Sequence, residues 1–455
     1  MARIAVVTGD VLGDHMAGPA IRALSIAAEL AKDHDVRLVT TGGGSIEDDR
    51  FTSVSTTPAG LRKALGGRDV VVLQGYTSLD MPWLLRSDVV VVADLYDPMH
   101  LEQLEQSAHL SGPQRQASVD LTLRVLNEQL LRADFLLCAG ETQRHLWLGA
   151  LSALGRVNVA TYGQDPTLRS LLAVCPFGFP SHPPARTGSP IRSGLGLGAS
   201  DKVVLWAGGV YDWLDPVSAI EAVDVLRHRR PDVRLVFQGM RHPNADVVPM
   251  AMPDRCRALA DERGLTGEHV FFLDWVPYEE RHDYLLDADV GLCTHPDHLE
   301  SEFAFRTRVL DYLWAGLPVV VSAGDELGAL VAAEGLGAVV RPGDTGALAD
   351  ALEALLYDEQ AIKSAAAHVA RVRDRFTWSS TLAPLVDFCA APKRAADAVG
   401  DQLRIARRPV LPTAEPARLA ARAGLALRRG GLKELWRAAS RRLGSDGDRL
   451  GGTHE

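Results

Sequence analysis

The chain has 455 residues, more than one hydrophobic core usually serves, so two domains and an appendage are expected. Its apolar fraction of 47% and charged fraction of 23% are ordinary for folded proteins and exclude extensive disorder. The net charge of −10 argues against a nucleic-acid-binding protein.

The five cysteines are odd in number, lie far apart and include no CxxC pair. They are expected to be reduced core residues, as in the cytosol. The apolar run that follows Arg3 ends at Val7, too short for a signal peptide, and no run is long enough for a transmembrane helix. The sequence therefore predicts a cytoplasmic protein.

In the first half, short β-branched runs alternate with helical stretches, the pattern of a parallel sheet buried on both faces. A loop with glycines follows the first run, and Pro19 then suits the first turn of an amphipathic helix over 20–30. Ligands of such doubly wound sheets bind beyond the carboxyl ends of the strands. The predicted strands are 4–7, 36–40, 70–73, 89–93, 135–138, 157–161 and 171–174.

A stretch rich in proline and glycine, 176–194, marks a linker, and a second series of strands and helices follows it. The strands of this series are predicted at 203–207, 234–238, 270–273, 290–293, 319–322 and 338–341. The chain is thus expected to be an α/β protein of two Rossmann-like domains facing across a cleft, where ligands usually bind. The expected divisions are 1–180, a linker at 181–195, 196–372, a helical segment at 373–392 and a tail at 393–455.

The tail is basic, because Lys and Arg far outnumber Glu415 and Glu434 between positions 404 and 442. Within residues 417–443, apolar side chains including Trp436 share one helical face and cations line another. This pattern predicts a helix on an anionic membrane surface at the inner face of the cell membrane. The alternative is a helix packed on the protein's own body.

The segment from Asp289 to Ser322 carries the clearest functional pattern. It joins two buried strands through a loop with two carboxylates and a helix expected to open with Phe305 and Arg306. A helix N-terminus attracts anions, so Arg306 and Arg308 could grip a diphosphate there, although one of them could instead be solvated. Asp311, one turn further on, could hold a sugar diol or simply favour the helix dipole.

The run LDYLWAGLPVVVS, with Asp311 five places before Gly316, follows these arginines. Together with the two Rossmann-like halves, it resembles the family 4 glycosyltransferases of the GT-B fold, over roughly residues 1–390. The resemblance implies metal-independent transfer of a sugar, with retention of configuration, from a nucleotide diphosphate sugar. It also implies a donor bound mainly to the second domain, an acceptor bound mainly to the first, and a final helix that crosses back.

The chain departs from the family pattern at two places. The first acidic residue belongs eight places before Asp311, where Phe303 stands, and Glu302 is the nearest carboxylate. The loop after strand 203–207 has Gly209 and Asp215 where the family places an Arg and a Lys. Arg306 and Arg308 are therefore expected to replace those cations.

Further site residues follow from the strand ends and from the resemblance. The predicted catalytic residues are Asp97, Glu302 and Arg306. The predicted donor-binding residues are Gly18, Gly208, Gly209, Val276, Arg306, Thr307, Arg308 and Asp311. The predicted acceptor-binding residues are Asp14, His15, Asp94 and Tyr96. Asp97 could instead cap the following helix.

No Walker A sequence is present, and no GxGxxG follows the first strand, so a nicotinamide or flavin enzyme loses its main support. The basic tail favours a lipid-linked acceptor, in glycan or cell-envelope polysaccharide biosynthesis, over a soluble one. Two alternatives stay open: a nucleotide-sugar epimerase of the same fold, and a catalytically silent scaffold that binds nucleotide sugars.

Overall fold

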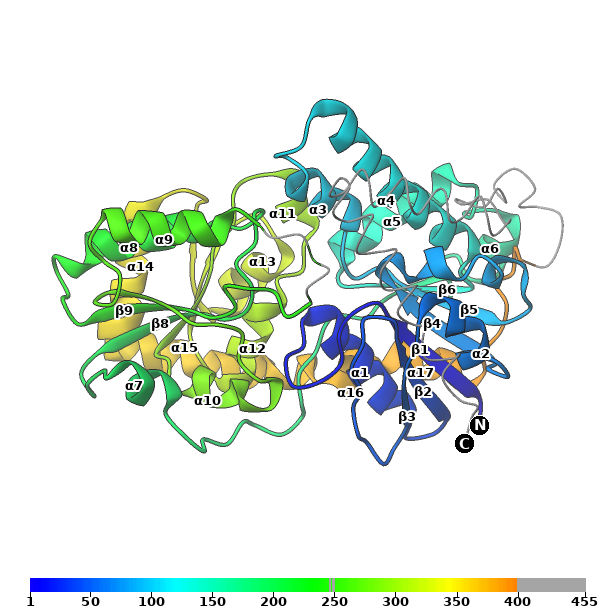
Figure 1. Cartoon of the computed structure of the whole chain (residues 1–455), viewed down its shortest axis with the longest axis horizontal. Coiled ribbons are helices and arrows are strands. Elements are labelled where there is room, and N and C mark those ends of the chain that lie inside the picture. The colour runs from blue at the N-terminus through cyan, green and yellow to red at the C-terminus, as the bar shows by residue number, and fades with distance from the viewer. Residues whose placement is uncertain (245–246, 248–249, 399–455) are drawn as a thin grey trace, which may run out of the picture.

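The computed structural model describes residues 1–244, 247 and 250–398. Two α/β halves lie side by side in Figure 1. The first contains a seven-stranded sheet in the order β3-β2-β1-β4-β5-β6-β7, and the second a six-stranded sheet in the order β10-β9-β8-β11-β12-β13. All pairings between these strands are parallel. The predicted α/β fold of two Rossmann-like domains is confirmed.

The first half runs from β1 to β7. Its elements are β1 (Arg3–Thr8), α1 (Gly18–Leu30), β2 (Asp35–Thr40), β3 (Thr52–Ser55), α2 (Leu61–Ala64), β4 (Val70–Gln74), β5 (Val90–Asp94), α3 (Met99–Gln106), α4 (Gly112–Arg132), β6 (Phe135–Cys138), α5 (Glu141–Ala153), α6 (Val159–Gln164) and β7 (Leu172–Val174). The central strands β4, β5 and β6 are buried along their whole length, as a sheet covered on both faces requires.

The second half begins with α7, which forms inside the expected linker. Its elements are α7 (Pro190–Leu195), β8 (Lys202–Trp206), α8 (Pro216–Arg227), β9 (Val233–Phe237), α9 (Met252–Glu262), β10 (Val270–Phe272), α10 (Arg281–Leu286), β11 (Val290–Cys293), α11 (Leu299–Phe303), α12 (Thr307–Ala315), β12 (Val319–Ser322), α13 (Glu326–Glu334), β13 (Gly337–Val340), α14 (Thr345–Tyr357) and α15 (Glu359–Val372). The segment after α15 forms α16 (Trp378–Thr381) and α17 (Ala383–Ala390).

Two of the sequence predictions for the first half are corrected. The run 157–161 is not a strand, because Asn158 caps α6 and exchanges hydrogen bonds with Thr161 in a capping box. Of its two valines, Val159 therefore begins the helix, and Val157 lies in the bend before it. The edge strand β3 was not predicted, since its four residues, TSVS, are half-exposed and give no apolar alternation.

Local chemistry explains how the chain enters and leaves two helices near the sheet edge. Asp215 accepts a hydrogen bond from the Ser218 amide at 3.1 Å and so caps α8. Gly316 ends α12 with φ +77°, the left-handed conformation that favours glycine, and the chain then turns into β12. Asp215, at a position where the resembled family has a cation, thus has a structural task.

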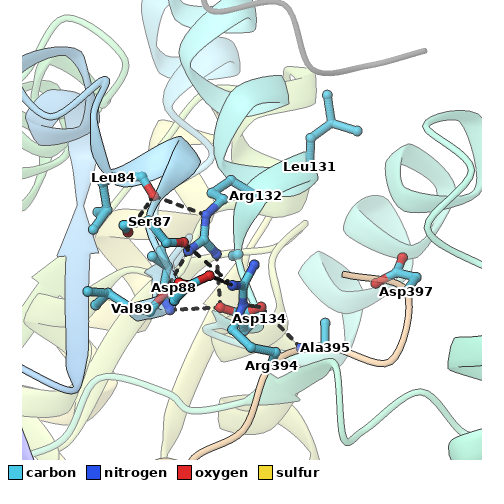
Figure 2. A network of polar contacts seen from close by, with 12 residues as sticks. Leu84, Ser87, Asp88, Val89, Leu131, Arg132, Asp134, Arg394, Ala395 and Asp397 are labelled. Atoms are coloured by element: carbon cyan, nitrogen blue, oxygen red, sulfur yellow. Dashed lines mark hydrogen bonds and ion pairs between the residues drawn. The ribbon is translucent and has the colours of Figure 1, made fainter. Parts of the chain in front are cut away.

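The segment after α15 returns to the first half. Helix α17 packs on β7, and the ring of Phe388 stacks on that of Phe135 with centroids 4.3 Å apart. Figure 2 shows how the chain beyond α17 is held by the buried carboxylate of Asp134. This carboxylate accepts hydrogen bonds from Arg394 Nε at 2.8 Å, the Ala395 amide at 3.1 Å and Arg132 Nη1 at 2.9 Å.

All five cysteines are buried and free, as predicted. Burial raises the pKa of the Cys175 thiol to about 12, so it is inert as a nucleophile. Within the described residues, no helix has the length and apolar character needed to cross a bilayer. The predicted amphipathic helix over 417–443 lies outside the described residues.

Candidate functional site

The two halves meet where the chain leaves the strands of both sheets. The backbone oxygen of Asp14, in the β1–α1 loop, accepts a hydrogen bond from the Tyr278 amide at 2.7 Å. The Trp275 indole donates to the oxygen of Met16 at 3.2 Å. Gln143, on α5, donates to the Phe303 oxygen at 2.9 Å. The predicted site residues of both halves lie on the elements and loops along this interface.

Helix α12 is fixed against the second sheet by Tyr312. A Cβ on Gly291 of β11 would lie 2.2 Å from the Tyr312 ring, so the glycine allows the ring to lie on the strand. The Tyr312 hydroxyl lies 2.9 Å from the Leu205 and Leu292 oxygens and accepts from the Ala207 amide at 2.9 Å. These contacts place the N-terminus of α12 beside the carboxyl end of β8.

Arg308 lies at that junction, beside the glycine turn after β8. Its Nη2 donates to the Gly209 oxygen at 2.7 Å, and its guanidinium carbon lies 4.7 Å from the centroid of the Trp206 ring. Gly208 adopts φ +81°, which glycine accepts without strain. Buried Nη1 has no hydrogen-bond partner. The turn and the first turn of α12 therefore offer an unused cationic donor, as an anion site needs.

Arg306 has a different environment from the one the sequence suggested. The helix begins at Thr307, two residues later than predicted, and Arg306 is its N-terminal flanking residue. Its Nη1 and Nη2 donate to the Glu300 carboxylate at 2.9 and 2.6 Å, with side-chain exposures of 7% and 1%. Burial lowers the pKa of Arg306, but the charge and hydrogen bonds of Glu300, together with weaker effects of Cys293 and Asp325, raise it above its usual value. Arg306 thus joins α11 to the start of α12.

Asp311 faces Arg281 from α10. Their closest ion-pair atoms are 3.7 Å apart, and the Arg281 guanidinium lies over the rings of Tyr278 and Trp314 at 3.7 and 4.7 Å. Burial raises the pKa of Asp311, and Arg281 opposes this shift. Val276, half-buried, lies in the connection between β10 and Tyr278. Asp311 keeps 35% of its side chain exposed, enough to meet a ligand.

In the first half, Asp94 forms a buried ion pair and has a structural role. Its carboxylate pairs with Arg22 Nε at 2.7 Å, with no exposure of either side chain. The guanidinium of Arg22 also lies 4.8 Å from the centroid of the Tyr96 ring. A Cβ on Gly18 would lie 3.6 Å from the Tyr96 hydroxyl, so Gly18 borders this stack. Asp94 and Tyr96 were both predicted to bind the acceptor substrate, but both are buried beneath Asp97.

Helix α3 of the first half packs on α11 of the second half. This packing brings three carboxyl groups close enough to change one another's pKa values, those of Asp97, Glu102 and Glu300. Burial raises the pKa of Asp97 to about 7, the Tyr96 hydroxyl lowers it, and the charges of Asp94 and Glu300 raise it. Burial also raises the pKa of Glu102 well above its usual range, aided by Asp97 and Glu300. A carboxyl with a pKa near neutrality at a domain interface suits proton exchange.

The remaining predicted residues lie nearer the solvent. Asp14 and His15 are exposed on the β1–α1 loop, Glu302 is exposed on α11, and Thr307 is half-buried as the first residue of α12. Asp97 does not cap α3, whose N-terminal flanking residue is Pro98 without a side-chain cap.

The sequence analysis did not single out Glu102 or Arg281, and it chose Glu302 as the nearest carboxylate to the family position, whereas Glu300 is the carboxylate that pairs with Arg306. Glu102 is hidden in an ordinary helical pattern, and the stacking of Arg281 between two aromatic rings joins separate elements. The proximity of Glu300 to the arginines was the available signal. Its pairing with Arg306 depends on the break between α11 and α12, which spacing did not reveal.

Two facing Rossmann-like domains with a C-terminal segment that returns to the first domain form the GT-B fold. The chain is similar to sucrose-phosphate synthase from Thermosynechococcus elongatus, with TM-score 0.60 and 19% identity over 86% of this chain and 98% of that one. It is also similar to Anabaena Alr3699/HepE in complex with UDP-glucose, with TM-score 0.62 and 16% identity over 86% and 100% of the chains. These likenesses show the fold.

Residues 201–358, within the second half, match the family described as Glycosyl transferases group 1. A D-inositol 3-phosphate glycosyltransferase from Xylanimonas cellulosilytica is 32% identical over 218 residues. This match covers 47% of the chain and 48% of the relative, about half the length of each.

Proposed function

We propose that this protein is a retaining glycosyltransferase of family 4, and that it transfers a sugar from a nucleotide diphosphate sugar to an acceptor. The observation that carries the proposal is the unpaired Nη1 of Arg308, beside the Gly208–Gly209 turn and the N-terminus of α12. A diphosphate there gains a charged donor, backbone amides and the helix dipole. The glycosyltransferase match over 201–358, which contains this site, supports the proposal.

The chemistry follows from these positions. The bond between the sugar C1 and the diphosphate oxygen breaks, its electron pair leaves on the phosphate, and Arg308 stabilises that charge. The acceptor oxygen bonds to C1 from the same face and gives its proton to the departing phosphate. Asp97, on the opposite half, orients the acceptor hydroxyl, while Asp311 holds a diol of the donor. The reaction as proposed requires no metal ion.

The donor site is tested by calorimetry with UDP, GDP, dTDP and ADP. The similar HepE structure contains UDP-glucose, so UDP is the first choice. Arg308→Ala should weaken the preferred nucleotide by about ten- to a hundredfold, the loss of about 1.5–3 kcal/mol from a charged hydrogen bond. Arg371→Ala, at an exposed position of α15, is the matched control and should bind normally. Equal affinity of the Arg308 variant and the wild type would contradict this donor site.

Turnover separates the proposal from its alternatives. Nucleotide release from the sugar donor only when acceptor is added supports a transferase, and unaffected turnover in excess EDTA supports metal independence. Epimerisation without acceptor would instead identify an epimerase, and nucleotide binding without any turnover would identify a scaffold.

The acceptor is proposed to be lipid-linked, in glycan or cell-envelope polysaccharide biosynthesis, because the sequence of 417–443 is basic and carries apolar residues at helical spacing. This segment would hold the enzyme on the cytoplasmic face of the membrane. Deletion of residues 413–455 should abolish co-sedimentation with anionic vesicles while leaving nucleotide affinity intact. Unchanged vesicle binding would refute this part of the proposal.

A further inference from the structure

The first turn of helix α5, in the first half, lies against the second half. Glu326 is the first residue of α13, and its two carboxylate oxygens accept hydrogen bonds from the Glu141 and Thr142 amides of α5, each at 3.3 Å. Amides in the first turn of a helix have no partner within the helix, and the helix dipole favours a negative charge beside them. A carboxylate of one half therefore caps a helix of the other half.

Helix α5 has no cap of its own. Its N-terminal flanking residue is Gly140, which has no side chain to accept from the first-turn amides. The backbone there does not require glycine, because φ −161° and ψ 174° are extended angles that any residue adopts. Space does require it, since a Cβ on Gly140 would lie 2.0 Å from Glu326 Oε2. Gly140 and Glu326 thus fit each other across the interface.

Gln143 adds a second contact from the same turn of α5. Its Nε2 donates to the Tyr96 oxygen at 2.8 Å and to the Phe303 oxygen at 2.9 Å, and the side chain is buried. Tyr96 directly precedes Asp97 in the first half, and Phe303 ends α11 in the second half. The first turn of α5 therefore joins the segment that carries Asp97 to α11 as well as to α13.

The segments that α5 contacts also border a cavity of about 420 Å³ in the second half. One wall of the cavity lies between His295 and Glu302, and the other consists of Ala323 and Gly324. The first wall continues into α11 and the second into α13, and both helices lie on the side of the second half that faces the first (Figure 1). The contacts of α5 therefore set the position of the first half relative to this cavity.

We propose that Glu326 is a positioning residue that latches the two halves together by capping α5. The latch fixes Asp97 of the first half relative to Arg308 and the cavity of the second half. Glu326 is only half-buried, so its charge returns to water when the halves separate, and the contact can form and break without leaving a buried unpaired charge. The inference rests on the proposed function in one respect, that turnover requires groups from both halves.

Hydrogen exchange on the full chain, resolved to single N–H groups by NMR, tests the latch. Two reporters lie elsewhere on the interface, at hydrogen bonds that join the halves. They are the Tyr278 amide, bonded to the Asp14 oxygen, and the Trp275 indole, bonded to the Met16 oxygen. Their exchange therefore measures separation of the halves.

Glu326→Ala should accelerate exchange at both reporters by about fivefold, the factor expected for one lost helix cap. Gly140→Ala should have the same effect, because its Cβ displaces the end of the flexible Glu326 side chain while the extended backbone is kept. Two substitutions on opposite sides of the contact, one of which leaves the carboxylate in the protein, thus test the same interaction.

A double variant separates the latch from simple capping of α5. Gly140→Ser with Glu326→Ala gives the helix an N-cap of its own, so the Thr142 amide should be protected again while both reporters stay fast. Two matched controls should leave the reporters unchanged. Glu359→Ala removes the exposed carboxylate at the first position of α15, and Gly149→Ala adds a Cβ within α5 that meets nothing within 4 Å.

The latch is overturned if the reporters exchange at wild-type rates in both Glu326→Ala and Gly140→Ala, or if the double variant restores those rates. Turnover is measured on the same samples. Glu326→Ala should lower kcat by about fivefold and leave the UDP affinity unchanged, since Arg308 and α12 belong to the second half. An unchanged kcat would refute the positioning role. A wild type that turns over no sugar donor would refute the proposed function, whereas the exchange rates would still decide the latch.

Discussion

Removing the charge of Arg306 should destabilise the protein, because this side chain neutralises a buried carboxylate. In Arg306→Met, the Glu300 carboxylate loses both guanidinium hydrogen bonds, at 2.9 and 2.6 Å, while its side chain stays 1% exposed. It also remains within the influence of Asp97 and Glu102, whose carboxyl pKa values are already raised.

Loss of one member of a buried ion pair costs about 3–5 kcal/mol, mainly because the other charge stays buried without a partner. For a domain of roughly 200 residues this corresponds to a fall of about 6–20 °C in Tm. The double variant Arg306→Met with Glu300→Leu removes both charges and should recover most of the loss, since apolar replacements of a complete pair are often neutral.

Differential scanning calorimetry of Arg306→Met, the double variant and a control variant measures these changes. Arg3→Met is the matched control, because Arg3 and Asp69 also form a close pair, at 2.7 Å, but are 55% and 43% exposed. That variant should lose no more than about 1 kcal/mol. If Arg306→Met melts within about 2 °C of the wild type and instead loses nucleotide affinity, Arg306 is a phosphate ligand and the reasoning fails.

Two further predictions concern pH and the returning segment. Since burial raises the pKa of Asp97 from 3.8 to about 7, its stabilising contribution is complete below pH 3.8 and is lost as the pH rises through about 7. Asp97→Asn should therefore reduce the fall in urea stability between pH 4.5 and 7.5, and an unchanged pH profile would contradict the shift. Asp134→Ala should accelerate hydrogen exchange at residues 394–397, because it removes the acceptor for Arg394 and Ala395. Asp69→Ala, which removes an exposed acceptor, should leave exchange there unchanged, and equal exchange in both variants would count against this anchor.

The sequence predicted the fold well because nearly all strands are continuous apolar runs in sheets buried on both faces. Such runs can be recognised without knowing their neighbours, as β4 and β12 illustrate with VVVLQ and VVVS. The prediction failed where local hydrogen bonding outweighs composition. The valines around Asn158 suggest a strand, but its side chain accepts from the Ala160 and Thr161 amides and begins a helix.

The sites were harder to predict because a motif gives the position of a charged residue but not its partner. Arg306 and Arg308 are two residues apart in the sequence, and the donor site was first inferred from both. In the structure Arg306 has a buried carboxylate for both of its terminal nitrogens, whereas Arg308 has only a backbone oxygen for one and nothing for the other. An arginine that has no carboxylate partner in the protein can pair its charge with an anionic ligand. This difference supports the proposed contact of Arg308 with the donor diphosphate and places Arg306 in the framework that joins α11 to α12. Under that proposal, the Arg308 variant should lose nucleotide affinity and the Arg306 variant should lose stability.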